Sequence, residues 1–163
     1  VRLVGSEMCI RDRGKPTLLT CRHAKVFSKG IATGKITGGC LTLLCRSLST
    51  SYEVQTRNRI LIIEDVNEPL YKLDGMLWQL KAAGKFKGIR GIVFGEMINC
   101  KPQKYSDGKF EDILADLFPN SKIPIITHCP VGHGKEIWTL PFETQATLNA
   151  SAKSLELKNC GVK

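Results

Sequence analysis

Long apolar runs are missing from this sequence of 163 residues. The clearest runs, 60–63 and 123–126, fall far short of the roughly 18 apolar residues that a membrane-spanning helix needs. We therefore expect a soluble protein without a membrane partner. Extensive disorder is also excluded, because 42% of the residues are apolar. A domain of this length buries about two thirds of its unfolded surface and needs neither a disulfide nor a structural metal.

Paired cysteine motifs are missing as well. The chain has seven cysteines, an odd number, and no Cys-x-x-Cys pair occurs among them. This pattern argues against a zinc cluster or a disulfide framework. It favours buried, reduced thiols in a cytoplasmic protein. The seven residues are Cys9, Cys21, Cys40, Cys45, Cys100, Cys129 and Cys160.

Aromatic residues are scarce, at 7% of the chain, although the net charge is +9. Residues 1–35 hold eight basic and two acidic side chains, a net charge of +6, which leaves +3 for residues 36–163. The remaining basic residues are not interleaved with aromatic ones, as they are in single-strand binding platforms. A small cluster of Lys85, Lys87 and Arg90 is typical of a solvated turn. We predict no nucleic-acid partner and keep a basic RNA-binding module as the rival from another class.

The start of the chain carries no secretory signal, and its first residue is Val1 rather than Met. We interpret residues 1–13 as an artefactual or disordered leader and leave them out of the fold. Residues 14–29 are predicted to be a linker, and residues 30–163 a single domain without internal repeats. The sequence is therefore expected to be a fragment.

Strand-like and helix-like segments alternate from about residue 30, which predicts an α/β fold with parallel central strands. We expect a small parallel or mixed sheet, two or three helices, and antiparallel strands at the end of the chain. The central strands are predicted at 34–39, 59–65, 91–95 and 123–127, and the terminal strands around 138–141, 145–149 and 154–158. The helices are predicted at 40–49, between a cap at Asn67 and a stop at Gly84, and between a cap at Asp107 and Pro119.

Two features could carry chemistry. Glu64 and Asp65 end one central strand, and Gly132-His133-Gly134 follows another. In open α/β sheets the functional crevice lies beyond the carboxyl ends of the strands, so both features are expected at the same end. A neutral histidine can take a proton from a hydroxyl nucleophile, while a carboxylate on its other ring nitrogen fixes the tautomer. The alternative is that Glu64 caps a helix or is solvated.

The other histidines predict no additional site. His128 and His133, with Cys129 or Cys100, could bind a transition metal, but their spacing in a Pro/Gly loop matches no common ligand pattern. We therefore predict no metal. His23 lies in the basic leader and is expected to be solvated.

Several motifs, taken together and in this order, are similar to one family. They are Thr33–Leu44, Ile60–Val66, Tyr71–Leu77, Gly91–Gly95 and Val131–Gly134. Between about residues 30 and 158 the chain resembles the C-terminal half of the LD-carboxypeptidases, a family that also contains the microcin C immunity peptidases. The resemblance implies the fold of the swivelling C-terminal domain of that family.

The resemblance also implies a function. Members are serine peptidases with a Ser, Glu, His triad, and the family's Glu and His fall on Glu64 and His133. The implied reaction is hydrolysis of the amide bond between an L- and a D-amino acid in peptidoglycan-derived tetrapeptides, without metal or cofactor. Cleavage of a peptidyl-nucleotide antibiotic is the alternative within the family. The implied partners are a small peptide substrate and the family's N-terminal domain, and a homodimer is left open.

The chain departs from the family pattern at three points. Val131 stands where the family usually has Phe, and Cys40 stands where Asn is common. We expect the family's N-terminal nucleophile domain to be missing from these 163 residues, in which no Gly-x-Ser-x-Gly occurs. We expect Glu64 and His133 to lie within hydrogen-bond reach and an apolar patch, edged by Met97, Ile98 and Trp138, to lie near them.

Overall fold

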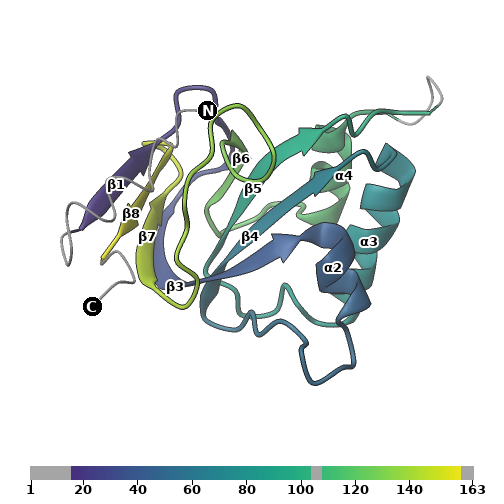
Figure 1. Ribbon diagram of the computed structural model, residues 1–163, viewed down its shortest axis with the longest axis horizontal. Helices are drawn as coiled ribbons and strands as arrows, with labels where there is room; N and C mark the ends of the chain where they lie inside the picture. The colour runs from purple at the N-terminus through teal and green to yellow at the C-terminus, as the bar shows by residue number, and fades with distance from the viewer. Residues whose placement is uncertain (1–15, 104–107, 159–163) are drawn as a thin grey trace.

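The structure, a computed structural model, describes residues 16–103 and 108–158. These residues form eight strands, all in one sheet, and three helices (Figure 1). The strands are β1 (Thr17–Thr20), β2 (Lys25–Ser28), β3 (Ile31–Cys40), β4 (Arg59–Val66), β5 (Gly91–Ile98), β6 (Ile125–Cys129), β7 (Gln145–Asn149) and β8 (Ser154–Leu157). The helices are α2 (Leu41–Arg46), α3 (Leu70–Ala82) and α4 (Phe110–Leu117).

The strand order is β1-β8-β7-β3-β4-β5-β6-β2. Strands β3, β4, β5 and β6 are parallel neighbours, and one helix follows each of the first three. Strands β7, β8 and β1 continue the sheet beyond β3 with antiparallel pairing, and β2 pairs antiparallel with β6 at the other edge. The predicted α/β fold, with a parallel centre and antiparallel terminal strands, is confirmed.

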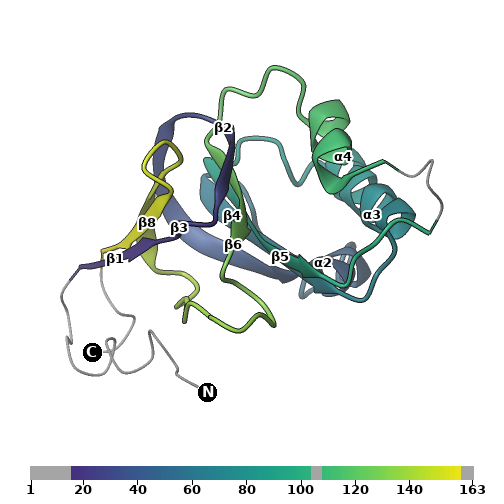
Figure 2. The same ribbon diagram turned by 90° about the horizontal axis from the view of Figure 1, so that it is seen from above.

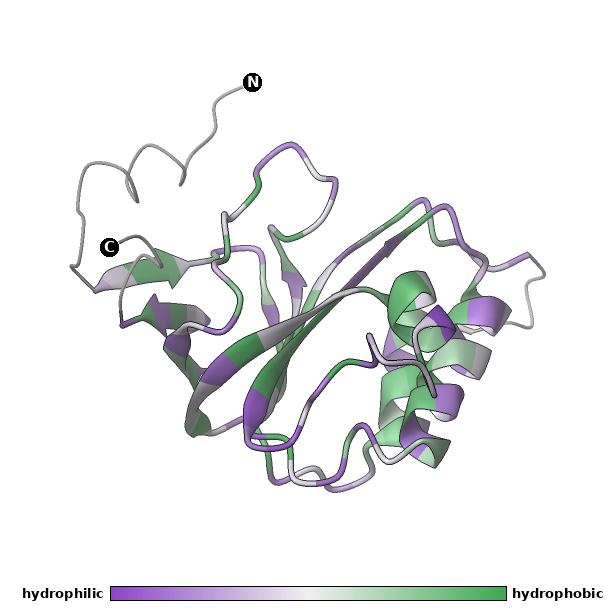
Figure 3. Ribbon diagram, turned by 60° about the horizontal axis from the view of Figure 1, so that its bottom comes forward, coloured by the Kyte–Doolittle hydropathy of each residue, from purple (hydrophilic) through white to green (hydrophobic). Residues whose placement is uncertain are grey.

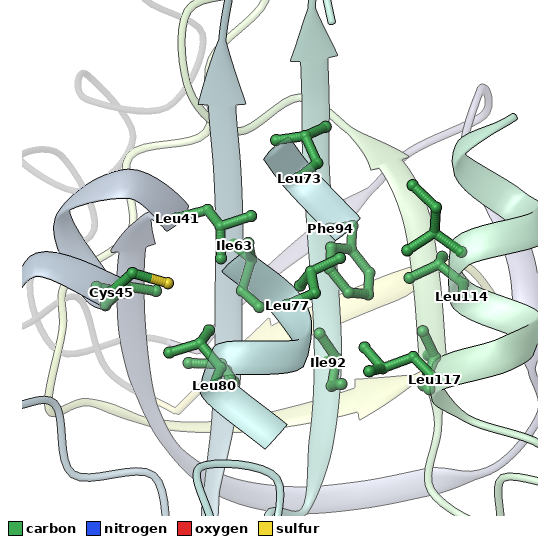
Figure 4. Close-up of a cluster of buried hydrophobic side chains, with 14 of the residues drawn as sticks. Leu41, Cys45, Ile63, Leu73, Leu77, Leu80, Ile92, Phe94, Leu114 and Leu117 are labelled. Carbon is green, nitrogen blue, oxygen red and sulfur yellow. The ribbon is translucent and has the colours of Figure 1, made fainter. Parts of the chain in front are cut away.

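All three helices pack on one face of the sheet (Figure 2). Leu70, Leu73, Leu77 and Leu80 recur at helical spacing along α3, and each is at most 4% exposed. In Figure 4 the α3 leucines lie over Ile63 of β4 and the β5 side chains, with α2 and α4 residues on either side. Figure 3 shows hydrophobic and hydrophilic stripes on these helices. Burial contributes about 1.5–3 kcal/mol for each such leucine, so this layer is a major source of stability.

The other face of the sheet curls around a second core. A flat sheet of eight strands would separate its edge strands by about 34 Å, at about 4.8 Å a strand. The edges are β1 and β2, yet only residues 21–24 join them, a connection that spans at most about 18 Å. The sheet must therefore bend until its edges approach each other (Figure 2). Its inner face buries Leu19, Ile36, Ile60, Ile62, Val93, Ile126, Leu148 and Leu155, among others.

The described part of the predicted linker, residues 16–29, contains two strands. Residues 17–20 pair with β8 and residues 25–28 with β6, so this stretch supplies both edges of the sheet. Its strands have only four residues each, and their partners lie about 100 residues or more away along the chain. Such pairing leaves little local pattern in the sequence, which is why the strands were not predicted.

The start of α3 also differs from the prediction. Its N-cap is Pro69, which has no side-chain cap, and not Asn67. Asn67 has a left-handed φ of 62°, and its Oδ1 accepts a hydrogen bond from Asn99 Nδ2 at 3.0 Å. Its side chain therefore ties the turn after β4 to the end of β5 rather than to the helix.

Two further predicted details are revised or left open. Asp107, the predicted cap of α4, lies outside the described residues; Lys109 is the N-cap, and its N–H donates to Asp112 Oδ2 at 2.8 Å. Residues 138–141 form no strand, although they were predicted as one.

None of the helices in the described ranges is long and apolar enough to cross a membrane.

The close approach of β3 to β4 depends on Gly38. Its φ is +134°, and a Cβ there would overlap the backbone of Ile62. We predict that Gly38→Ala lowers the free energy of unfolding by about 2 kcal/mol or more, measured by urea denaturation. The matched control is Gly75→Ala in α3, where an added Cβ meets open space and should raise the free energy by about 0.5–1 kcal/mol. Equal effects of the two substitutions would contradict this account.

Candidate active site

The end of β4 sends two carboxylates to opposite faces of the sheet. Leu61 and Ile63 belong to the core beneath the helices, whereas Ile60 and Ile62 belong to the core of the curled face. Successive side chains of a strand alternate between its faces. Asp65 therefore follows the helix side, and Glu64 follows the curled side.

Asp65 serves the structure of the helix layer. Its Oδ2 accepts hydrogen bonds from the Thr42 N–H at 2.9 Å and from the Thr42 hydroxyl at 2.8 Å. Thr42 lies in the first turn of α2, whose own N-cap, Cys40, makes no side-chain cap. A carboxylate from the neighbouring strand thus satisfies a free N–H of the helix start. Asp65 is fully engaged there and is not the acid that meets His133.

Glu64 meets His133. Its Oε2 lies 3.1 Å from His133 Nδ1, although the two residues are 69 positions apart in the chain. The expected approach within hydrogen-bond reach is confirmed. The Glu64 side chain is 9% exposed, whereas the His133 side chain is 68% exposed. With Nδ1–H donating to Glu64, the imidazole keeps Nε2 free to accept a proton from a hydroxyl.

The pairing register shifts by one residue near the carboxyl ends of two strand pairs, β4–β5 and β5–β6. Ile63 pairs with Phe94 but Asp65 pairs with Met97, so β5 carries one extra residue beside Glu64. Val93 pairs with Ile126 but Gly95 pairs with Cys129, so β6 carries an extra residue as well. Such bulges bend a strand and redirect its side chains. They bring the end of β5 and the loop after β6 against the end of β4.

The loop that carries His133 is anchored at both of its ends. The Val131 N–H donates to Cys129 O at 2.7 Å, and the Trp138 N–H donates to Pro130 O at 2.7 Å. The Glu96 N–H donates to Val131 O at 3.3 Å, which joins the loop to β5. These bonds hold the base of the loop while His133 stays at the surface.

A cleft of about 920 Å³ opens beside His133. Its walls come from the β1–β2 connection, the end of β5, the end of β6 and the His133 loop. Sequence reasoning missed Glu96, which lines this cleft. His23 is exposed, as predicted, but it lies in the β1–β2 connection and lines the cleft rather than belonging to a leader. Only the unpredicted bulges and edge strands bring them there. The charged and histidine side chains of the lining are Arg22, His23, Glu96, His128, His133, Lys135 and Glu136.

His128 lines the same cleft as His133. Its Nδ1 lies 2.8 Å from the Thr127 hydroxyl, and its φ of 59° lies in the left-handed region, where His is more common than most residues with a side chain. Burial, assisted by the positive charge of Lys25, lowers the pKa of His128 below the ordinary value. In the stretches 16–103 and 108–158, no group of three or more His, Cys, Asp or Glu side chains could hold a metal ion.

The cysteines of the described chain are free thiols. Burial, with a smaller effect of the Asp65 charge, raises the pKa of Cys45 to about 11. Burial also raises the pKa of Cys129 and of Cys100. A thiol attacks as its thiolate, so these three residues are poor nucleophiles near neutral pH.

The predicted basic cluster and the predicted apolar patch have the following outcomes. Lys85 is buried, forms an ion pair with Glu53 and donates to Val54 O at 3.1 Å, so it is not a free surface charge. Met97, Ile98 and Trp138, the predicted edge of an apolar patch, are each partly buried. The extent of such a patch stays a prediction.

Comparison with known proteins identifies the family of this chain. Residues 33–148 match the model of the LD-carboxypeptidase C-terminal domain. The chain is 34% identical over 126 residues to a Bacillus subtilis protein named "Probable murein peptide carboxypeptidase". That match covers 77% of this chain and 40% of the relative. The chain thus spans about two fifths of that relative's length.

Solved structures agree with the fold. Muramoyltetrapeptide carboxypeptidase from Oxalobacter formigenes superimposes with a TM-score of 0.75 at 26% identity, over 93% of this chain and 51% of that one. The microcin C7 self-immunity protein MccF, in complex with aspartyl sulfamoyl adenosine, gives a TM-score of 0.77 at 18% identity, over 86% and 42%. The second likeness concerns the fold alone. This chain belongs to the LD-carboxypeptidase family, and residues 33–148 correspond to its C-terminal domain.

Proposed function

We propose that this chain is the C-terminal half of a serine-type LD-carboxypeptidase. The proposed reaction is hydrolysis of the amide bond between an L- and a D-amino acid in a peptidoglycan-derived tetrapeptide. The observation that carries the proposal is the 3.1 Å contact between Glu64 and His133, in a chain that belongs to this family. The name of the Oxalobacter formigenes neighbour, a muramoyltetrapeptide carboxypeptidase, supports the choice of substrate.

His133 acts first as a general base and then as a general acid in this proposal. Its Nε2 accepts the proton of a serine hydroxyl as that oxygen attacks the scissile carbonyl, and the same proton then passes to the leaving amine. Glu64 keeps the other ring nitrogen protonated and stabilises the imidazolium that forms. No metal or cofactor takes part. A water molecule then attacks the acyl-serine ester. His133 takes a proton from the water and gives a proton to the serine oxygen as the ester bond breaks.

The serine belongs to the family's N-terminal domain in this proposal. Within the described residues, no serine hydroxyl is hydrogen-bonded to His133, whose side chain is 68% exposed and lines the cleft. The nucleophile and the amides of an oxyanion hole would approach from the side of the cleft. The free thiols of the described chain fit a reducing compartment, and we place the reaction in the cytoplasm.

Cleavage of a peptidyl-nucleotide antibiotic is the second candidate. It is favoured by the likeness of the fold to MccF, whose solved complex contains aspartyl sulfamoyl adenosine. The two candidates are separated by offering the same active preparation an L,D-tetrapeptide and an aminoacyl sulfamoyl adenosine. Turnover of the nucleotide compound alone would replace the first candidate with the second.

We predict that the chain alone does not release D-alanine from an L,D-tetrapeptide. Without a serine the dyad activates only water, and without oxyanion-hole amides the transition state loses about 3–4 kcal/mol of stabilisation. Release is measured by mass spectrometry. Joining the chain to the N-terminal half of the Bacillus subtilis relative should restore turnover, and His133→Ala should then reduce it by about 10²- to 10⁴-fold. Hydrolysis by the chain alone that survives His133→Ala would show that the chemistry lies elsewhere.

Substitutions of the two carboxylates of β4 should have different effects, one on activity and the other on stability. We predict that Glu64→Gln in the joined enzyme lowers kcat by about 10²- to 10⁴-fold, since the base loses its charged partner. Asp65→Asn should instead lower the free energy of unfolding of the chain by about 1 kcal/mol, because Asp65 holds the start of α2. Enzyme assays and urea denaturation check the two arms. The assignment of roles is wrong if Asp65→Asn alone abolishes turnover in a fully folded protein.

A further inference from the structure

The carboxylate of Glu64 lies between two glycines that come from different elements. Gly95 is on β5, and a Cβ built there would lie 2.9 Å from Glu64 Cβ. Gly132 is in the loop after β6, and a Cβ built there would lie 2.5 Å from Glu64 Oε2 and 3.1 Å from Glu64 Cδ. Real Cβ atoms essentially never approach other atoms below 3.0 Å. Both positions therefore exclude any side chain while Glu64 occupies its present place.

The space at the two glycines depends on the local backbone. The extra residue of β5 sets Gly95 beside Glu64, and its Cβ would also overlap the carbonyl of Val131. Gly132 has a φ of +107°, a conformation that residues with a side chain rarely adopt. The loop and β5 thus close over Glu64 at a separation that only glycines permit.

We infer that Gly95 and Gly132 are positioning residues, which form a steric slot that aims the Glu64 carboxylate at His133 Nδ1. The inference rests on the proposed function only for its effect on catalysis, because the slot itself is a property of this chain. The slot explains how the Glu64 side chain can be held in one position although the His133 side chain, its hydrogen-bond partner, is 68% exposed. An imidazole at the surface gains its orientation from a carboxylate that cannot move.

The slot also limits how long the acidic side chain at position 64 can be. A side chain at position 132 would push the carboxylate away from Nδ1, and a carboxylate on a shorter side chain would retreat from the intruding Cβ. Glu64→Asp should therefore relieve the overlap with the carboxylate that Gly132→Ala creates, and leave the tight 3.1 Å approach to the Cβ at position 64. The backbone strain that Gly132→Ala introduces at positive φ is the same with Glu or Asp at position 64, so it cancels when the two backgrounds are compared.

The test is a double-mutant cycle on the whole chain, with Gly132→Ala, Glu64→Asp and both together. Urea denaturation measures the unfolding equilibrium constant of each variant. We expect Gly132→Ala to be at least about tenfold less damaging in the Glu64→Asp background than in the wild type. Additive effects would overturn the inference. If Gly132→Ala does not fold, the double variant decides, since recovery of the fold supports the slot and its absence overturns it.

A second readout follows the orientation of His133 itself. Ring ¹⁵N chemical shifts distinguish the Nδ1–H from the Nε2–H tautomer, and the wild type should show Nδ1–H at His133. Gly95→Ala should shift His133 toward the tautomer mixture of Glu64→Ala, while the control Gly75→Ala should keep the wild-type signals. A wild-type pattern in folded Gly95→Ala would contradict the slot. Should the joined enzyme prove inactive while these shifts change as expected, the proposed function fails and the slot stands.

Discussion

The alternation of side chains along β4 is the constraint on which the site depends. This strand is covered by the helix layer on one face and by the curled sheet on the other, so Ile60, Leu61, Ile62 and Ile63 are all at most 1% exposed. A shift of one residue would exchange the two sets of side chains, at a large cost in buried apolar surface. The register of the last two residues is therefore fixed by the core before them. As a result, the Glu64 side chain points toward His133, and the Asp65 side chain points toward α2.

This constraint gives the two neighbouring carboxylates different roles. Asp65 accepts hydrogen bonds from the start of α2 at Oδ2 and from the Val66 N–H at Oδ1, so its predicted role is structural. Glu64 is buried and contacts His133, which is largely exposed and lines the cleft. A buried carboxylate beside an exposed imidazole is the arrangement that the proposed mechanism requires, because there the reacting hydroxyl comes from another domain. Burial also keeps water away from the carboxylate, which strengthens its interaction with an imidazolium.

The sequence predicted those parts that local pattern controls. Apolar runs and helical spacing indicated the parallel centre and the leucine face of α3, and the strand ends indicated that Glu64 and His133 would meet. Pairing between distant segments was not predictable in this way, so β1 and β2 were taken for a linker. The extra residues in β5 and β6 have no local signature either. As a result Glu96 and the seat of Glu64 between Gly95 and Gly132 became visible only in three dimensions.

The curl of the sheet connects these observations. Because residues 21–24 join the two edge strands, the curled face closes around its core and brings the β1–β2 connection to the same end of the sheet as the His133 loop. A segment about 110 residues before His133 in the sequence thus forms a wall of its cleft. The inner core needs both edges to exclude water, so the edge strands that stabilise this face also define the cleft. Stability and the shape of the cleft therefore depend on the same short connection, while the core of β4 sets the direction in which Glu64 points toward His133.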